Sequence, residues 1–596
     1  MTGTSGITSH ITGSDGVDLA VHSYTEIDPA RSTILAIHGY PDNHHVWDAV
    51  AEEFAERYRD RYNVVAYDVR GAGESSCPAT RSGYAFGQLV SDIGAVIDSL
   101  GVERVHLLAH DWGSIQAWAA VTADSVMGDS VMGRIASFTS ISGPHLQYAG
   151  AFLRSGRTPR TLARVARQLV SSGYIGFFLC PVVPELAFRS RMGVKVVEAL
   201  ERIGRSSTRS RHRKPPRSAA DYVNGLNLYR ENMPAPFLAP GPLPKTTVAV
   251  QVLAPRRDIF VTPALQRFTG SIPAGGRVIS IEGGHWVVTS RPEVIARLTA
   301  EWVDRNTGAS AADGAPVARG GPREVRGKLA LVTGAGAGIG RATAVELARH
   351  GAHKVVIVDR DLAAANETAD AVRAACAEAA VYRADVSDES AMNDLAAQVL
   401  TEHGVVDILV NNAGIGMAGR FLETTPANWD DIIGVNLRGI ISGSRAFGAQ
   451  MVERGEGGTI INVASAAAFL PSKSMLAYGT TKAAVLAFSE SLRADLADEG
   501  ITVTAVCPGF VNTNIAKSTI YAGMSDEQQA RAREKADAAY RRRNYTPEAT
   551  ARAIVKAVRT GPAVLPIAAE SRIGYAMRRI SPSAIRLFAR FDIRQK

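Results

Sequence analysis

Cysteine is scarce in this sequence, and long apolar runs are missing. The four cysteines, Cys77, Cys180, Cys376 and Cys507, lie far apart and form no Cys-x-x-Cys pair, which excludes a zinc cluster and a disulfide framework. No window reaches the ~18 consecutive apolar residues that a membrane-spanning helix needs. The N-terminal segment MTGTSGITSHITGSDG has neither a basic nor an apolar stretch, which is not typical of a secretory signal. We therefore expect a soluble protein of the cytoplasm.

The composition gives no sign of wholesale disorder. Hydrophobic residues make up 46% and charged residues 21% of the 596 residues, close to the globular average. The length is about four times the ~150 residues of a typical domain, so at least two domains are expected. Gly, Ala, Pro and Ser dominate the stretch DRNTGASAADGAPVARGGPRE at 304–324, which has no apolar periodicity. We predict domains at 1–304 and 325–596 and a linker at 305–324.

On both sides of this linker, short apolar runs alternate with helical stretches. This pattern predicts an α/β fold class, with parallel sheets covered by helices in both halves. The strands are expected at 33–38, 63–68, 105–110, 136–141, 247–254 and 277–281, then at 329–333, 354–358, 407–411, 458–463 and 502–506. The helical pattern between 142 and 246 interrupts the first alternation, which predicts an inserted cap over about 145–245.

Charge is concentrated in one segment. The net charge is +8, and residues 151–217 hold fifteen Arg or Lys against three Asp or Glu, so the rest of the chain is slightly acidic. This distribution argues against a nucleic-acid binder and for a local basic face. RIGRSSTRSRHRKPPR (202–217) is either a solvated cap loop or a surface for anionic lipid, an acyl carrier or a membrane. The C-terminal tail, 577–596, is both basic and apolar. It is either a packed terminal helix or a segment that contacts the inner membrane face.

A strand, a sharp turn and an amphipathic helix are predicted for VHLLAHDWGSIQAWAA at 105–120. Small residues at Ala109 and Gly113 allow a steep turn that lifts Asp111 above the sheet, with Asp where esterases place Ser. A carboxylate nucleophile attacks carbon and forms an alkyl ester, which suits an epoxide or alkyl halide better than a carboxylic ester. The alternative is that Asp111 only caps the following helix.

Two further residues follow apolar runs in the order nucleophile, acid, base. Asp258 comes after TVAVQVLAP, and His285 lies in EGGHWVV. His285 would activate a water, Asp258 would orient its imidazole, and backbone amides of HGYP (38–41) could form an oxyanion hole. His38, His44 and His45 could also indicate a metal site. No carboxylate or cysteine spacing supports one, and we predict no metal.

These motifs make the first half resemble the epoxide hydrolases of the α/β-hydrolase fold, over roughly 7–304. The matching motifs are HGYP, YDVRGAGESS (67–76), HDWG and GGHW. The resemblance implies two cap tyrosines that donate hydrogen bonds to the epoxide oxygen, and it points to Tyr174 and Tyr229. Haloalkane dehalogenases share Asp, His and Trp112, but many place Asn where this chain has Tyr40, so the epoxide interpretation is favoured.

The second half opens with a glycine turn between a strand and a helix, GKLALVTGAGAGIGRATAVELARHGA at 327–352. Its glycines let the backbone approach a pyrophosphate at the helix N-terminus, and Ile339 lies within the turn. The three glycines of the motif are Gly334, Gly338 and Gly340. Asp359 ends the next apolar run, where a carboxylate binds ribose hydroxyls and repels a 2′-phosphate. NAD is therefore favoured, and the adjacent Arg360 leaves NADP open.

The residues predicted to carry the chemistry of this half lie farther on. Tyr478 and Lys482 are four residues apart and share one helix face, and Ser465 precedes Tyr478 by 13 residues. An ammonium beside a phenol favours the phenolate, which makes the tyrosine a usable acid and base. The serine can hold the substrate oxygen.

Together with the glycine turn, these residues make the second half resemble the classical short-chain dehydrogenase/reductases, over about 325–570. The resemblance implies that Asn436 completes a tetrad with Ser465, Tyr478 and Lys482. It also implies cofactor contacts by Asp385, Val386, Asn412, Ala413, Gly414, Pro508, Gly509 and Thr513. Association through helices near 430–452 and 475–495 would give a dimer or tetramer.

The fusion as a whole resembles the mycobacterial-type bifunctional epoxide hydrolase with a short-chain dehydrogenase tail. It implies hydrolysis of an epoxide to a vicinal diol and NAD(P)-dependent oxidoreduction of an alcohol or ketone, on lipid-like substrates. Two alternatives remain for the first half: a dehalogenase, or a lipid-binding module without activity.

Overall fold

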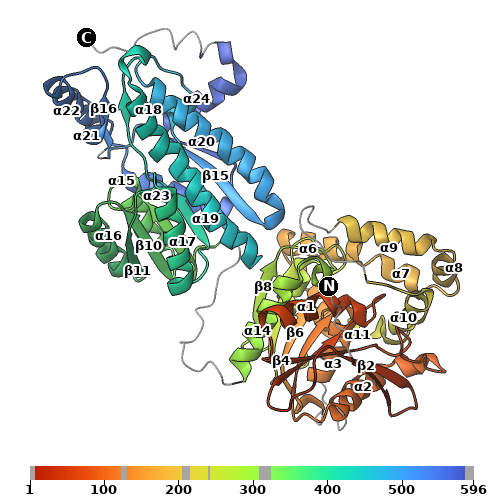
Figure 1. The fold of residues 1–596 in the computed structure, drawn as a ribbon. Helices are drawn as coiled ribbons and strands as arrows, with labels where there is room; N and C mark the ends of the chain where they lie inside the picture. The colour runs from red at the N-terminus through yellow and green to blue at the C-terminus, as the bar shows by residue number, and fades with distance from the viewer. Residues whose placement is uncertain are drawn as a thin grey trace. The chain divides into compact units, whose positions relative to one another are not determined.

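The computed structural model describes residues 7–122, 131–203, 215–238, 242–307, 324–513, 515–583 and 585. The chain forms two compact units, 1–314 and 315–596 (Figure 1). Most of the predicted linker, of the basic run 202–217 and of the tail 577–596 lies outside the described residues. Two α/β units are present, as the alternation of strands and helices predicted.

The first unit is built on an eight-stranded sheet of order β1-β2-β4-β3-β5-β6-β7-β8, parallel from β4 onward. The strands are β1 (Ile7–Thr12), β2 (Asp18–Ser23), β3 (Ser32–Ile37), β4 (Tyr62–Tyr67), β5 (Val105–His110), β6 (Ile135–Ile141), β7 (Ala249–Pro255) and β8 (Arg277–Ile281).

Helices cover both faces of this sheet because its central strands are apolar on both sides. In β3, Leu35 and Ile37 pack with helices α2 and α3, while Ile34 and Ala36 pack with α1 and α14. The helices of this layer are α1 (Asp48–Arg57), α2 (Phe86–Ser99), α3 (Trp112–Thr122), α12 (Pro263–Gly270), α13 (Val287–Ser290) and α14 (Pro292–Asn306).

The cap lies between β6 and β7, and its described elements are helices joined by loops. Its helices are α5 (Leu146–Arg154), α6 (Pro159–Ser171), α7 (Tyr174–Leu179), α8 (Val183–Arg189), α9 (Met192–Ile203), α10 (Ala219–Asn232) and α11 (Ala235–Leu238). Among the described residues, no single helix is long and apolar enough to cross a membrane. Two successive helical segments, Thr161–Leu179 and Val183–Arg189, together have the length and composition of a membrane span, but they are bent by 91° relative to each other.

The second unit is a seven-stranded, fully parallel sheet of order β11-β10-β9-β12-β14-β15-β17. Its strands are β9 (Leu329–Thr333), β10 (Lys354–Asp359), β11 (Glu378–Arg383), β12 (Ile408–Asn411), β14 (Gly458–Val463), β15 (Ile501–Pro508) and β17 (Val564–Ile567). A separate pair is formed by β13 (Met417–Ala418) and β16 (Ile520–Tyr521).

Alternate residues of each central strand again point to opposite helix layers. Ala330 and Val332 of β9 pack with α15, α16 and α23, and Leu329 and Leu331 pack with α17 and α19. The helices are α15 (Gly338–Arg349), α16 (Leu362–Ala374), α17 (Glu389–His403), α18 (Pro426–Ile433), α19 (Gly439–Arg454), α20 (Leu476–Asp495), α21 (Ile515–Ser518), α22 (Asp526–Arg543), α23 (Pro547–Thr560) and α24 (Ala569–Ile580).

Two candidate active sites

Asp111 stands on a tight turn directly after β5. Its φ of +52° is a left-handed conformation that costs a non-glycine residue free energy. The turn needs glycine neighbours, because a Cβ on Gly113 would come 2.2 Å from the Ile37 carbonyl oxygen, and one on Gly143 would come 2.1 Å from the Asp111 carbonyl oxygen. The Tyr40 backbone N–H, from the HGYP segment, donates to Asp111 Oδ1 at 2.8 Å. The carboxylate is thus held beside a backbone donor at the end of the sheet.

His285 lies between the other two predicted residues. Its Nε2 is 3.4 Å from Asp111 Oδ2, and its Nδ1 is 3.2 Å from both oxygens of Asp258. Asp258 is fixed by the backbone N–H groups of Phe260 and Val261, each at 2.9 Å. Burial alone would lower the pKa of His285, but the two carboxylates outweigh it and raise that pKa to about 10.

The two predicted cap tyrosines come from different helices and meet above Asp111. Tyr174 is on α7 and Tyr229 on α10, and their ring centroids are 6.2 Å apart. The Tyr229 ring lies 4.9 Å from that of Trp112, the residue after Asp111. Burial raises the pKa of both phenols, and the charge of Asp111 raises it further. Both hydroxyls are therefore protonated and can donate hydrogen bonds.

A buried ionic cluster below the cap was not found from the sequence. Arg217 contacts Asp42 at 2.5 Å and Glu201 at 2.6 Å, and it lies over the Trp286 ring at 5.5 Å. The Trp286 indole N–H also donates to Asp42, at 2.9 Å. Asp42 directly follows the HGYP segment and Trp286 follows His285, so one arginine of the cap joins the two loops that flank the carboxylates. No sequence signal separates Arg217 from its basic neighbours.

His44, considered above as a metal ligand, is bound to a carboxylate. Its Nδ1 and the Nε2 of His22 each lie 3.0 Å from Asp68, which belongs to the YDVRGAGESS motif. These bonds hold the pKa of Asp68 well below its usual range, although burial alone would raise it. The Nε2 of His38 accepts from the Val69 backbone N–H at 2.9 Å.

In the second unit, the glycine turn joins β9 to α15 as predicted from the motif. Gly334 and Gly338 have φ values of +62° and +55°, which glycine adopts without strain. A Cβ on Gly340 would come 2.1 Å from the Gly334 carbonyl oxygen, so this position packs the helix against the turn. Asn412 stabilises the turn, because its side-chain amide donates hydrogen bonds to the carbonyls of Thr333 and Gly334 at 3.0 Å each.

A cavity of about 760 Å³ opens over this turn, at the carboxyl ends of the parallel strands. It is lined by most of the residues predicted for cofactor and chemistry: Gly334, Gly338, Ile339, Asp359, Arg360, Asp385, Val386, Asn412, Ala413, Gly414, Ser465, Tyr478, Lys482, Pro508, Gly509 and Thr513. Asp359 accepts from the Gly336 N–H at 2.8 Å, which fixes its carboxylate at the cavity wall. Asp385 is held by Ser387 through its N–H and its hydroxyl, which lowers the pKa of the carboxyl.

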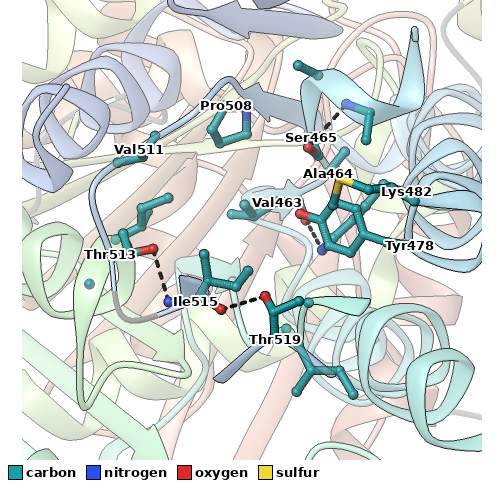
Figure 2. A pocket seen from close by; sticks show the side chains of 18 of the residues that line it. Val463, Ala464, Ser465, Tyr478, Lys482, Pro508, Val511, Thr513, Ile515 and Thr519 are labelled. Atoms are coloured by element: carbon teal, nitrogen blue, oxygen red, sulfur yellow. Dashed lines mark hydrogen bonds between the residues drawn. The ribbon is translucent and has the colours of Figure 1, made fainter. Parts of the chain in front are cut away.

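Figure 2 shows Ser465, Tyr478 and Lys482 together on one side of the cavity, with Thr513 and Ile515 on the other. The Lys482 Nζ lies 5.8 Å from the Tyr478 ring centroid and donates to the Val463 carbonyl at 2.9 Å. Contrary to the expected effect of the ammonium, burial raises the pKa of Tyr478, and it lowers that of Lys482 to about 8. A hydrogen bond with Ser465 acts in the opposite direction on Tyr478, but burial is the larger effect.

Two predicted residues, Gly340 and Asn436, lie beside the cavity rather than in its lining. Asn436 is fully buried in a single π-helical turn at 434–438, where its Oδ1 accepts from the Ile415 N–H at 2.8 Å. A Cβ on Gly414 would lie 3.1 Å from this oxygen and 3.3 Å from the Lys482 Nζ. Asn436 and the lysine therefore approach the same point behind Gly414.

The far wall of the cavity was not predicted. Tyr540 of α22, Glu570 and Met577 of α24, and Ile585 all line it. Glu570 accepts from the Phe510 N–H at 2.8 Å, which ties α24 to the loop after β15. These residues lie in segments whose sequence is charged or basic, and only the fold brings them to the site.

Comparisons with known proteins agree with this two-part geometry. The family model described as the α/β-hydrolase fold matches residues 32–173, and that described as short chain dehydrogenase matches residues 328–521. A Mycobacterium tuberculosis protein named "Probable oxidoreductase EphD" is 38% identical over 97% of this chain and 98% of its own length.

Other relatives match the second unit alone. The 2,3-dihydro-2,3-dihydroxybenzoate dehydrogenase of Bacillus subtilis is 35% identical over 32% of this chain and 72% of its own. A Burkholderia phymatum short-chain dehydrogenase/reductase crystallised with NAD is 32% identical over 44% of this chain and 96% of its own, with a TM-score of 0.41. The match to the Mycobacterium tuberculosis protein over nearly the full length of both chains, together with the two family models, shows the family of this chain. It belongs to the family in which an α/β-hydrolase-fold domain is fused to a short-chain dehydrogenase domain.

Proposed function

We propose that the chain is a bifunctional enzyme: an epoxide hydrolase at 1–304 and an NAD(P)-dependent oxidoreductase at 325–596, joined by a linker at 305–324 and acting in the cytoplasm on lipid-like substrates. The observation that carries the hydrolase assignment is the arrangement around Asp111. A carboxylate on a strained turn faces an imidazole on one side and two protonated phenols on the other.

In the first step, Asp111 attacks an epoxide carbon and the carbon–oxygen bond opens. Tyr174 and Tyr229 donate hydrogen bonds to the departing oxygen, and one phenol proton neutralises the alkoxide. This donation is needed because an alkoxide is a poor leaving group. The products of the step are an ester on Asp111 and a free hydroxyl on the neighbouring carbon. Tyr174, half-buried at the edge of the cap, and the fully covered Tyr229 reach the oxygen from two helices.

Before the second step, the protonated His285 gives its proton to the phenolate that the first step left. Its neutral imidazole then takes a proton from water, and the hydroxide attacks the ester carbonyl. Formation of the ester removes the negative charge of Asp111, one of the causes of the high pKa of His285. Loss of that charge lowers the pKa of the imidazole, so that more of it is neutral and able to take a proton at the stage that needs a base. The Tyr40 N–H, already 2.8 Å from Asp111 Oδ1, stabilises the oxyanion. Its collapse breaks the ester bond, and the proton of the added hydroxide passes to the departing alkoxide, which releases the diol and leaves Asp111 ionised.

The dehalogenase alternative has less support. A halide site would need a donor at the position of Tyr40, but the Tyr40 hydroxyl donates to the Tyr222 carbonyl at 3.1 Å. Its ring packs against Phe178 and Tyr229 of the cap. A module without activity would not need Asp111 to be held in its strained conformation.

The test is hydrolysis of an aromatic epoxide by the full chain. Asp111→Ala should abolish it and leave hydride transfer unchanged. His285→Gln should form the ester without releasing it, and mass spectrometry should find the added mass on Asp111. A wild-type enzyme that turns over no epoxide, or a His285→Gln variant without an adduct, would contradict the covalent mechanism.

For the second unit we propose NAD as the cofactor. The fit rests on the glycine turn, whose small residues leave room for a pyrophosphate, and on the Asp359 carboxylate at the cavity wall, where the ribose hydroxyls would bind. The other residues that would hold the dinucleotide also line the cavity. They are Asp385 and Val386, which would lie near the adenine, and Asn412, Ala413, Gly414, Pro508, Gly509 and Thr513. When bound, NAD accepts a hydride from an alcohol carbon, or NADH returns it to a ketone.

Within this site, the chain's own residues hold the substrate and move its proton. Ser465 would bind the alcohol oxygen, and Tyr478 would take its proton as the carbon is oxidised. Lys482 would assist the phenolate, and Asn436, behind Gly414, would lead the proton away through water. Because burial raises the pKa of Tyr478 in the free protein, the phenol would have to lose its own proton before it could take that of the alcohol.

The test is the change in NADH absorbance with a panel of secondary alcohols and ketones. Tyr478→Phe should lose hydride transfer by at least about a hundredfold, the usual scale of general acid–base catalysis, and keep its affinity for NADH. Equal loss of binding and turnover would show that Tyr478 only shapes the pocket.

A further inference from the structure

The outer surface of the cap is unusually apolar. In the described part of the first unit, ten large apolar side chains are strongly exposed, and nine of them lie between residues 162 and 196. We define the cap face as Leu169, Val170, Phe177, Leu186, Met192 and Val196, which are 39% to 83% exposed. Exposed single hydrophobics are ordinary, but a concentrated set marks a site of interaction.

The cap face is carried by four successive helices. α7 contacts α8 and α8 contacts α9, and only a two-residue break separates α6 from α7. Figure 1 shows these helices on the same side of the first unit. α6 is strongly amphipathic, yet of its apolar side chains only Val165 is buried, while Leu169 and Val170 are exposed. The apolar side of this helix therefore exceeds what the core of the unit covers.

Basic residues accompany the apolar ones. Residues 151–203 hold nine Arg or Lys and three Asp or Glu. Arg164 and Arg167 on α6, and Arg189, Arg191 and Lys195 around α8 and α9, are exposed.

Two ion pairs within the cap involve acids of this stretch. Glu185 pairs with Arg230 and Glu201 with Arg217, both at 2.6 Å. An apolar surface rimmed by cations is complementary to a lipid surface with negative headgroups.

One helix connects the cap face to the proposed epoxide site. Phe177 is exposed, while the next residue, Phe178, is buried with its ring 5.1 Å from Tyr229 and 5.3 Å from Tyr40. Tyr174, one helical turn before Phe178, also lies beside Tyr229. Helix α7 thus presents Phe177 to the cap face and Phe178 to the aromatic residues beside Trp112.

We propose that the cap face docks on an anionic bilayer, so that an apolar epoxide passes from the lipid past α7 to Asp111. The docking stands on the exposed side chains and charges alone, and the delivery of substrate rests on the proposed epoxide hydrolase function. An acidic acyl carrier protein or a second copy of this chain are the other occupants that such a surface could take.

The experiment is sedimentation of the full chain with vesicles of phosphatidylcholine, with and without phosphatidylglycerol. We expect binding to the anionic vesicles that weakens as salt is added. The double variant Val170→Asp, Leu186→Asp should weaken it by about tenfold or more, because interfacial binding scales with buried apolar area. The matched control is Leu362→Asp, Leu400→Asp, which changes two exposed leucines on α16 and α17 of the second unit and should bind as the wild type does.

The two claims fail separately. The cap double variant should hydrolyse a water-soluble epoxide at the wild-type rate and a bilayer-dissolved long-chain epoxide more slowly. Hydrolysis without any vesicle binding, or vesicle binding that the cap variant leaves unchanged, overturns the docking. Vesicle binding with no turnover of any epoxide overturns the proposed function and leaves the docking in place. Binding to an acyl carrier protein in place of vesicles, or a lower oligomeric state in the variant alone, overturns the docking by assigning the cap face to another partner.

Discussion

The charge of Asp111 contributes to the raised pKa of His285. In the free enzyme, two carboxylates hold the imidazole protonated up to a pKa of about 10, against a burial effect of opposite sign. In the proposed mechanism, formation of the ester would remove the charge of Asp111 and leave that of Asp258. The basicity of His285 is therefore expected to fall between the first and the second step, which lets one imidazole serve as cation and then as base.

This coupling predicts a difference between two pH profiles. An NMR titration of His285 in the free enzyme should give a midpoint near 10, since the pKa is raised and the imidazolium persists below it. Ester hydrolysis, followed in single turnovers, should rise with pH and level off at a lower midpoint, because the neutral imidazole is the active form. Identical midpoints would mean that Asp111 does not contribute to the charge of His285.

Asp359 gives a second prediction at this scale. Its carboxylate is fixed at the cavity wall by the Gly336 N–H, and Arg360 lines the cavity beside it. Asp359→Ala should remove the repulsion of a 2′-phosphate and raise the affinity for NADP relative to NAD by about tenfold, equivalent to ~1.4 kcal/mol. The ratio of the two dissociation constants measures it. A wild type that already prefers NADP would show that Arg360 decides the preference.

At the scale of elements, the central strands were predictable because a parallel strand covered on both faces is a continuous apolar run. The edge strands β1, β11 and β17 were missed for the opposite reason. β1 is polar and largely exposed, β11 is only partly covered, and β17 is short and contains Pro566. The inner strand β2 escaped because only four of its six residues are buried and they include His22.

The same distinction applies to the sites. Asp111, Gly334 and Tyr478 belong to short motifs whose chemistry depends on local spacing, and such motifs are visible in sequence. Arg217 and Ile585 reach their sites through long-range packing of the cap and of the C-terminal segment, for which the sequence carries no periodic signal. Tyr174 and Tyr229 were predicted only through the family resemblance, since a cap tyrosine has no distinctive spacing.

The Arg217 cluster predicts a large effect on stability from one cap residue. Arg217→Ala would remove a buried cation that contacts both Asp42 and Glu201, which costs about 3–5 kcal/mol in the free energy of unfolding. Denaturant unfolding of the full chain, followed for its first unit, measures the loss. The control is Arg81→Ala, which breaks an exposed pair with Glu231 and should cost no more than about 1 kcal/mol. Similar losses for both variants would show that the cluster adds little.

At the scale of the whole molecule, we expect copies of the chain to associate through their second units. The helices that we predict to associate correspond to α19 and α20, and Ile441 on α19 is 38% exposed. Light scattering of the full chain should give a dimer or tetramer, which Ile441→Asp should shift toward the monomer because a charge would be buried in the interface. Leu362→Asp, on α16, should leave the oligomer intact. A monomeric wild type would contradict this arrangement.

The fusion of two sites in one chain leads to the last prediction. Hydrolysis of an epoxide yields a vicinal diol, and a secondary alcohol of that diol is the kind of group that the second site would oxidise. Supplied with a long-chain epoxide and NAD, the full chain should form NADH and a hydroxyketone after a lag in which diol accumulates. Asp111→Ala should form no NADH from the epoxide and the normal amount from added diol, whereas Tyr478→Phe should stop at the diol. If added diol is never oxidised while other alcohols are, the two sites serve separate substrates, and their fusion reflects a shared location, such as the lipid surface proposed for the cap.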